Sequence, residues 1–473
     1  MALSSLLGSA GELAGGAAGG LTGAVGGLAG GAGVSAPLTY TGLQSEYGDF
    51  AYPQAQILFN QTPLDTASAD LIVNDIRVEL TAGFEASVAS FRIYNVYDPS
   101  AGSFRFDAVK SQVLLGAALE IQLGYLNKLK TVFVGFVAGV SFGYEAHDLP
   151  YIEVTGMDVK GIMMAGTYAN QLTANNYGDA VSEILRRTGY EQLKQGGGIL
   201  NIQVTPTPDK QGAGTAGGAA GGLTGGLSGA AGGLGGAAGG GAGKASAYTV
   251  EMVSESDYEF VVKAAKKFNY EFFTDRGTVY FRKAKSVTAP LMTLGVGSGL
   301  VTFHVEYSIT GIVGSIEARA MNAGDGKLIS AKGTFQNSMS TAARAKGLVS
   351  TGKKVLIDPT ISSQSDADAR VESLMEQMSY RLGSLEGDCV GIPDLVPGRF
   401  ITLSGLGAPV DNSFYLTTVV HEFRDDTGYQ THITGKADRV SGGGAGALGA
   451  AAGGLTGGAL GGAAGAAGGL IGL

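Results

Sequence analysis

Residues 254–283 read SESDYEFVVKAAKKFNYEFFTDRGTVYFRK, and the first half of this stretch predicts a helix. Ser256 and Glu259 have the spacing of a capping box, in which two side chains bind the free amides of a first helical turn. Ser254 and Asp257 have the same spacing. Apolar residues then recur at i, i+3, i+4 and i+7 and form one helical stripe: Val261, Ala264, Ala265 and Phe268.

The second half of the stretch predicts a β-hairpin. Residues 270–273 and 278–281 are rich in aromatic and β-branched residues, and Asp275-Arg276-Gly277 lies between them with the composition of a tight turn. The whole stretch is therefore expected to be an α+β packing unit in the middle of the chain.

The composition limits the class of protein. A chain of 473 residues has room for two to four domains. Its net charge of −9 argues against a nucleic-acid-binding surface, because phosphate contacts need clustered Lys and Arg. The single cysteine, Cys389, excludes an intrachain disulfide framework and fits assembly in a reducing cytoplasm. The N-terminus, MALSSLLGSAGEL, lacks the positive region of a signal peptide.

Three Gly-rich blocks, at 1–36, 212–243 and 441–473, share the phrase Ala-Gly-Gly-Leu-Thr-Gly. Three interpretations stay open: flexible linkers or tails, lipid-embedded helices that pack through Gly-x-x-x-Gly spacings, and an ordered plug in a closed lumen. Against the lipid interpretation, a spanning helix needs about 20 strongly apolar residues, and Gly and Ala are barely apolar. We expect the blocks to gather on one side of the assembly or in its bore, because all three carry the same phrase.

The rest of the chain predicts two β regions around a smaller α/β region. Residues 37–160 contain short alternating strands at 56–60, 71–80, 87–96, 119–125, 128–137 and 151–156. Residues 161–299 form the α/β region, with a helix at 177–187 and the insertion 212–243. Residues 300–440 contain a helix at 366–383 and strands at 302–307, 314–320, 327–333, 396–403, 414–423 and 429–435. Short strands at this spacing favour a barrel or a sandwich.

The order of these segments resembles the phage late-control protein D and VgrG-like tail baseplate hub family, over most of residues 55–440. The resemblance rests on the Ser-Asp-Tyr helix start at 256–258 and on the following positions: Gly124, Gly135, Gly156, Asp158, Pro397, Gly398, Tyr415, Val420, His421, Gly428, Tyr429 and Thr431. It implies a β-rich α+β fold, with two tube-like β-barrel domains and a smaller α/β domain inserted between them. The strands that end near Tyr125 and Tyr415 are expected to occupy equivalent places in the two barrels.

The resemblance also implies a function. The chain would be a structural baseplate hub of a contractile phage tail or related injection particle, assembled in the host bacterial cytoplasm. It would form a homotrimer that adapts a six-fold tail tube to a three-fold spike. Expected partners are the tube or a tail-tip adaptor protein, the spike and the tape measure protein, with a baseplate wedge as a further candidate and membrane contact left open. The family's oligonucleotide-binding-fold and needle regions have no counterpart here, so the spike is expected to be a separate protein.

Several residues invite a catalytic or metal-binding interpretation. His421-Glu422 resembles the start of a zinc-binding helix, but position 425 is Asp where a second His is needed, and the segment is predicted to be a strand. A pair of His421 with His432 across two strands is an alternative, weighed against a polar-tipped strand residue, which is the commoner case.

The other candidates have simpler interpretations. Helix-start acids are expected at Asp366, Asp368, Glu251, Glu255 and Asp257. Gly295-x-Gly297-x-Gly299 lacks the helix and acidic partner of a dinucleotide loop, and Cys389 has no nucleophile motif. We therefore expect no catalytic, cofactor-binding or metal-binding residues and no enzyme activity. Two other classes stay open: a secreted pore-forming protein, which would make liposomes leak, and a tail-tip cell-wall hydrolase, which would clear a peptidoglycan gel.

Overall fold

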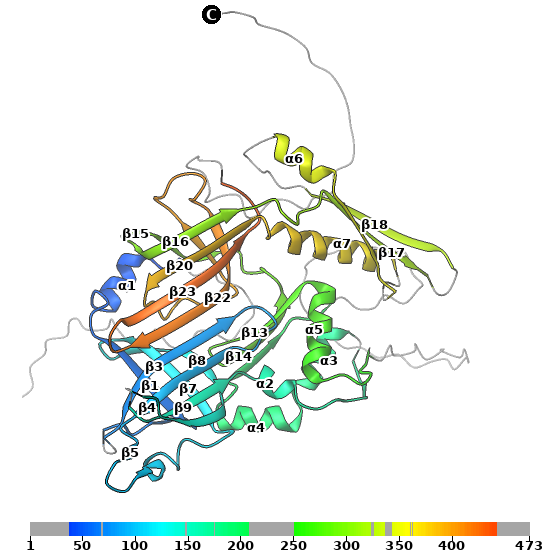
Figure 1. Ribbon diagram of the computed structural model, residues 1–473. Coiled ribbons are helices and arrows are strands. Elements are labelled where there is room, and N and C mark those ends of the chain that lie inside the picture. The colour runs from blue at the N-terminus through cyan, green and yellow to red at the C-terminus, as the bar shows by residue number, and fades with distance from the viewer. Residues whose placement is uncertain are drawn as a thin grey trace, which may run out of the picture. The chain divides into compact units, whose positions relative to one another are not determined.

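A computed structural model describes residues 37–67, 70–146, 149–174, 176–207, 250–322, 326–335, 343–359, 361 and 363–441. The three Gly-rich blocks lie outside the described residues, apart from residue 441, and so does the hypothesis about where they gather. The described chain is rich in strands, as Figure 1 shows.

Six strands form the first β module: β1 (Pro53–Phe59), β3 (Ile72–Thr81), β4 (Val88–Tyr94), β7 (Ala118–Tyr125), β8 (Lys128–Gly143) and β9 (Tyr151–Met157). They lie in the order β1-β7-β8-β9-β4-β3, and every neighbouring pair is antiparallel. Shorter elements flank them: α1 (Tyr40–Glu46), β2 (Thr62–Pro63), β5 (Tyr97–Asp98), β6 (Ser103–Phe104) and a 3-10 turn at Phe106–Ala108. Alternate residues along these strands are buried, as the period-2 pattern predicts.

A second six-stranded module closes into a barrel. Its strands are β15 (Pro290–Val296), β16 (Gly299–Tyr307), β20 (Gly383–Val390), β21 (Phe400–Leu403), β22 (Ser413–Arg424) and β23 (Gly428–Ala437). Their order is β15-β21-β22-β23-β20-β16, and β15 pairs with β16 to complete the ring. The fold class expected from the sequence is confirmed.

The two modules repeat one strand order. If the strands of each module are numbered 1 to 6 along the chain, their order in the sheet is 1-4-5-6-3-2 in both modules. Strands 2 to 6 have the same antiparallel pairing in both modules. Strand 1 differs, since β1 runs antiparallel to β7 but β15 runs parallel to β21. The equivalence expected for the strands near Tyr125 and Tyr415 is wrong by one strand: Tyr125 ends β7, which corresponds to β21, whereas Tyr415 lies in β22, which corresponds to β8. Tyr125 therefore precedes the turn between strands 4 and 5 of the first module, whereas Tyr415 follows the connection between strands 4 and 5 of the second.

One α/β unit follows the first module. Its elements are α2 (Lys160–Met163), β10 (Gln171–Leu172), α3 (Tyr177–Ile184), α4 (Thr188–Gly196), β11 (Asn201–Val204), β12 (Val250–Glu251), α5 (Asp257–Phe268), β13 (Tyr270–Asp275) and β14 (Thr278–Lys283). The helix and hairpin predicted for 254–283 are confirmed as α5, β13 and β14. The capping box forms at Ser256 and Glu259, whereas Ser254 lies before the helix with φ +52°.

A second insertion lies between β16 and β20. It contains β17 (Ser315–Met321), β18 (Leu328–Thr334), α6 (Ala343–Ser350), β19 (Lys353–Ile357) and α7 (Gln364–Ser379), and its strands form a separate sheet in the order β18-β17-β19. The helix predicted for 366–383 is therefore shorter than expected, because β20 already begins at Gly383.

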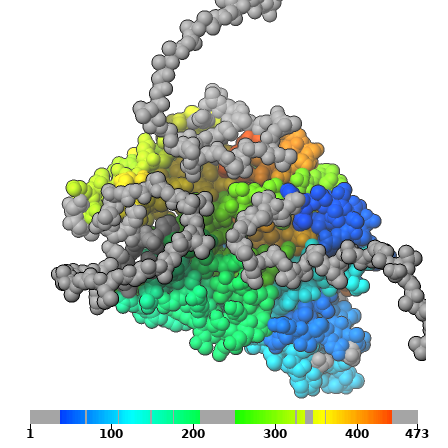
Figure 2. Space-filling model, turned by 180° about the vertical axis from the view of Figure 1, so that it is seen from behind, coloured from blue at the N-terminus to red at the C-terminus, as the bar shows by residue number. Residues whose placement is uncertain are grey.

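The hydrophobic core is continuous across the two β modules. One cluster of buried residues includes Phe91 and Ile121 of the first module and Phe414 and Ile433 of the second. The start of the described chain packs on the second module, where Leu38 donates its amide to the carbonyl of Leu291 at 2.8 Å. Figure 2 shows α1, in dark blue, beside strands of the second module. The division into domains at residues 160, 299 and 440 stays a proposal, and β15 lies before residue 299 although it belongs to the barrel.

Candidate assembly surface

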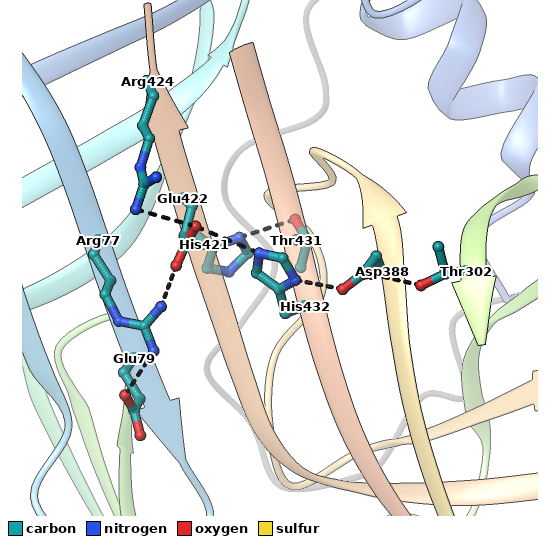
Figure 3. A network of polar contacts seen from close by, with 9 residues as sticks. All are labelled: Arg77, Glu79, Thr302, Asp388, His421, Glu422, Arg424, Thr431 and His432. Atoms are coloured by element: carbon teal, nitrogen blue, oxygen red, sulfur yellow. Dashed lines mark hydrogen bonds and ion pairs between the residues drawn. The ribbon is translucent and has the colours of Figure 1, made fainter. Parts of the chain in front are cut away.

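A row of polar side chains crosses five neighbouring strands on the outer face of the sheet (Figure 3). These strands are β3, β22, β23, β20 and β16, so the row passes from the first module into the second. Alternate residues of each strand point into the core, and the residues between them form the row: Glu79, Arg77, Glu422, His432, Asp388 and Thr302.

Glu422 is the centre of the row. Its carboxylate forms an ion pair with Arg77, which lies opposite it in the register of β22 and β3. The carboxylate also lies 3.8 Å from Nη2 of Arg424 and 3.5 Å from Nε2 of His432. Because Arg77 and Glu422 belong to different modules, this contact reinforces the strand pairing that joins them.

Asp388 lies between His432 and Thr302, which is the last residue of the row. The Nδ1 atom of His432 lies 2.5 Å from its carboxylate, and the hydroxyl group of Thr302 donates a second hydrogen bond to it. Since a carboxylate only accepts, Nδ1 of His432 carries the hydrogen. The pKa of Asp388 is lowered by these donors, Thr302 first.

His421 points to the opposite face of β22, into the core. Its side chain is fully buried, and Nδ1 lies 2.9 Å from the hydroxyl group of Tyr429 and 3.3 Å from that of Thr431. Burial lowers the pKa of His421 to about 3, assisted by the positive charge of Arg276. The alternative of a His421–His432 pair across two strands is wrong, because His432 lies opposite Val420 and so on the outer face.

The loop between β20 and β21 joins the two modules and the α/β unit. All residues from 391 to 398 are buried in it. Asp394 accepts hydrogen bonds at 2.7 Å from Tyr47 and from Lys130, and burial together with Asp394 raises the pKa of Tyr47. Arg276 of the α/β unit donates to the carbonyl of Pro393 at 3.2 Å. Sequence reasoning missed this loop, although an acidic residue within the apolar run Gly-Ile-Pro-Asp-Leu-Val-Pro-Gly was a usable signal.

A second polar contact fixes the α/β unit to the barrel. Glu271 of β13 accepts a hydrogen bond from the hydroxyl group of Tyr415 and one from Nε of Arg282 at 2.5 Å. Arg282 also donates to the carbonyl of Gly398 at 2.9 Å. The strand predicted to start at 396 begins at Phe400, because Gly398 has φ +77° and the loop before it turns away from the sheet. Tyr415 and Gly398, two of the positions on which the family resemblance rests, therefore serve packing between units.

Strands β8 and β16, the two ends of one antiparallel run of strands, each have a stretch of edge without a partner strand among the described residues. From β8 to β16 the order β8-β9-β4-β3-β22-β23-β20-β16 is antiparallel throughout. The pairing of β8 with β7 ends at Phe136, and that of β16 with β15 ends at Leu300. Residues 139–143 and 302–306 are consequently paired on one side only, and each stretch is preceded by a residue at which the register shifts, Ala138 and Val301. Unpaired edges of this kind are templates for another strand.

The remaining candidates from the sequence have structural roles. Asp366 lies in the first turn of α7, and Asp257 lies in the first turn of α5, where it is buried and pairs with Arg187. Asp368 accepts a hydrogen bond from Gln364. Glu255 precedes α5 and binds Lys263, and Glu251 lies in β12, so neither is in a helix as expected.

The glycine motif and the cysteine likewise belong to the barrel. Gly297 and Gly299 have φ of +77° and +91° in the turn between β15 and β16, which only glycine adopts easily. Cys389 is buried in β20, and burial raises the pKa of its thiol to about 12. Among the described residues no group of three or more His, Cys, Asp and Glu side chains is arranged to hold a metal ion. No helix in the described part of the chain is both long and apolar enough to cross a membrane.

Comparisons with known proteins identify the fold. A family model described as the Alg8 N-terminal domain matches residues 244–425, which is less than half of the chain. No protein of curated function matches the sequence. The solved tail protein from Neisseria meningitidis MC58 aligns with a TM-score of 0.54 and 12% identity, over 82% of this chain and 97% of its own. The 43 kDa tail protein of prophage MuSo2 from Shewanella oneidensis aligns with a TM-score of 0.53 and 12% identity, over 81% and 98%. The chain has the fold of these tail proteins.

Proposed function

We propose that the chain is a structural component of a contractile phage tail or related injection particle, and that three copies form its baseplate hub. The shared fold with two tail proteins supports the first part. The repeated strand order supports the second, since three copies with two similar modules each supply six modules around one axis. Such a ring meets a six-fold tube on one side and a three-fold spike on the other.

The continuous antiparallel sheet from β8 to β16 is the observation that carries the proposal. Because it has eight strands, its two end strands run in opposite directions, so a free β16 edge can pair antiparallel with the free β8 edge of the next copy. Three copies would then close one sheet without an exposed edge. The polar row in Figure 3 lies on the outer face of this sheet and would face a water-filled bore.

The partners proposed for this ring are those that the family resemblance implies. The ring would bind the tail tube or a tail-tip adaptor protein on one side and a separate spike protein on the other, with the end of the tape measure protein in the bore. A baseplate wedge is a further candidate on the outside. The protein would assemble in the host bacterial cytoplasm and reside in the tail baseplate, without enzyme activity.

Native mass spectrometry of the purified full chain tests the proposal. A trimer has three times the monomer mass of 47.8 kDa, and negative-stain images would show a ring with an open centre. Val301 lies on the free β16 edge with 65% of its surface exposed, so Val301→Lys should leave the fold intact and block edge pairing. Val253→Lys, at a side chain 73% exposed and away from both edges, is the matched control and should stay trimeric.

Two outcomes would contradict the proposal. If the protein is a monomer at micromolar concentration, the proposal of a trimeric hub is wrong. If the Val301→Lys protein remains trimeric, the proposed pairing of the β16 edge with the β8 edge is wrong.

A further inference from the structure

Among the residues that the structure describes, the sheet β18-β17-β19 is covered on one face only. Helix α7 packs along β17 and β18, as Figure 1 shows. The side chains that the sheet presents to the helix are buried, namely Ala318, Ala320, Ile329 and Ala331, together with Val371 of α7. On the other face four large apolar side chains are exposed, at 65% for Met321, 63% for Leu328, 47% for Val355 and 79% for Ile357.

The strand register places these four side chains together. Met321 lies opposite Leu328, and Ile357 lies opposite Arg319, the residue two positions before Met321. Val355 is two positions before Ile357 on the same strand, so the alternation of side chains keeps all four on one face. Single exposed apolar residues are common, but a contiguous apolar patch of this kind marks an interaction site.

The same face carries an excess of positive charge. Glu317 accepts a hydrogen bond from Nε of Arg319 at 2.6 Å and pairs with Lys353, and these two cations lower its pKa to about 2, Arg319 first. Lys332 lies on this face too, because its neighbours Ala331 and Gly333 face α7. Among the described residues of this face, three cations against one carboxylate leave a net charge of +2, in a chain whose total is −9. An acidic partner is therefore favoured over a basic one.

The dimensions of the face fit one helix. Strands of seven residues, such as β17 and β18, extend about 23 Å at 3.3 Å per residue. Three strands at about 4.8 Å spacing are about 10 Å wide, which is the diameter of a helix with its side chains. The 16-residue helix α7 already covers the opposite face in this way. A second helix would complete a three-layer arrangement, which buries both faces of the sheet.

We propose that this open face docks an amphipathic helix of a partner protein, with acidic residues beside its apolar stripe. The apolar stripe covers Met321, Leu328, Val355 and Ile357, and the acidic residues approach Lys332, Arg319 and Lys353. This docking site does not depend on the trimer, because β17, β18 and β19 lie in an insertion outside the β8-to-β16 sheet.

Binding of two designed peptides to the full-length protein tests the inference. Both are 16-residue amphipathic helices with the same leucine stripe, one flanked by Glu and the other by Lys, and fluorescence anisotropy measures their affinity. We expect the Glu peptide to bind at least about tenfold more tightly than the Lys peptide. Ile357→Asp should weaken binding of the Glu peptide by about tenfold, whereas Val253→Asp, at a similarly exposed β-branched residue, should not. Lys332→Glu should reduce the preference for the Glu peptide.

Three results would overturn the inference. Equal affinity for both peptides would show that the site does not prefer an acidic partner. If Ile357→Asp leaves peptide binding unchanged, the peptide does not bind to this face. A native mass that falls when Ile357 is replaced by Asp indicates that a second copy of this chain occupies the face. The trimer is tested separately at Val301, so failure here and failure of the hub proposal are distinguishable.

Discussion

The hydroxyl group of Tyr125 donates a hydrogen bond to the main-chain carbonyl of Gly391 at 2.9 Å, across 266 positions of the chain. Tyr125 ends a strand of the first module, and Gly391 begins the buried loop of the second. The ring of Tyr125 also packs on that of Tyr429, with centroids 5.7 Å apart. The two modules therefore share a buried polar contact in addition to their continuous core.

We expect Tyr125→Phe to destabilise the protein by about 1–3 kcal/mol, because the buried carbonyl of Gly391 loses its donor while the ring stays in place. Tyr52→Phe is the matched control, since the side chain of Tyr52 is 74% exposed, and it should change stability by less than about 0.5 kcal/mol. Urea unfolding followed by circular dichroism measures both. Equal midpoints for the two variants would show that the contact does not stabilise the fold.

Gly391→Ala tests how closely the same loop packs. A Cβ atom there would lie 2.2 Å from Cγ of Tyr429 and 2.7 Å from the hydroxyl oxygen of Tyr125, so the buried rings must move. We expect a loss of about 1–3 kcal/mol or more. Gly189→Ala, in helix α4 with no atom within 4 Å of the new Cβ, should instead be neutral or stabilise by up to about 1 kcal/mol. Thermal unfolding of the two variants separates them, and a melting temperature for Gly391→Ala at or above wild type contradicts the packing argument.

Local signals predict part of this fold well. Residues 254–283 were predictable because capping, helical periodicity and turn composition all act within a few residues of one another. Strand β15 was missed because Pro-Leu-Met-Thr-Leu-Gly-Val has no alternating pattern and pairs with β21, more than a hundred residues later.

The candidate surface depends even more on distant pairing. Arg77 and Glu422 are 345 positions apart, and no local pattern indicates that β3 lies beside β22. The alternation on β22 and β23 could have placed His421 and His432 on opposite faces, had the register between the strands been known. Register is a property of the packed sheet, so the sequence alone left the histidine pair open.

The buried, neutral His421 makes stability depend on pH. Its pKa is about 3 in the folded protein and about 6.5 when exposed, so between these values the unfolded chain binds one more proton. Acidification through this range therefore favours unfolding, by about 1.4 kcal/mol per pH unit from this residue. Above about pH 6.5 the imidazole is neutral in both the folded and the unfolded chain, so this destabilisation is absent.

His421→Asn removes that titration. We expect the variant to be less stable than wild type at pH 7.5, and the difference to shrink by about 2–3 kcal/mol between pH 6.5 and pH 4.5. His304→Asn, at an exposed position of β16, should follow the wild-type pH profile more closely. Urea titrations at several pH values give the curves, and a constant difference for His421→Asn at every pH would refute the buried neutral imidazole.

Asp257 and Asp107 allow one substitution to be compared in two environments. The side chain of Asp257 is 2% exposed and binds Arg187 and the hydroxyl group of Tyr190, the latter at 2.7 Å, so it joins α5 to α4 and the segment before it. Asp257→Asn leaves the guanidinium group of Arg187 without its carboxylate, and we expect a loss of about 3–5 kcal/mol. Asp107 pairs with Lys110 but is 86% exposed, and Asp107→Asn should change stability by less than about 1 kcal/mol. Similar losses in calorimetry for the two variants would mean that burial of the Asp257 pair has no energetic consequence.

Cys389 reports directly on opening of the barrel, because it is the single cysteine and lies buried in β20. Burial raises the pKa of its thiol to about 12, so at pH 8 the reactive thiolate is scarce and shielded from reagents. We expect labelling by a chromogenic disulfide reagent to be slow in the native protein and fast in urea. Gly391→Ala, two residues further along the chain, should accelerate labelling under native conditions by favouring local opening, whereas Gly189→Ala should not. Complete labelling of the wild-type protein within seconds would show that the barrel does not shield Cys389 at β20.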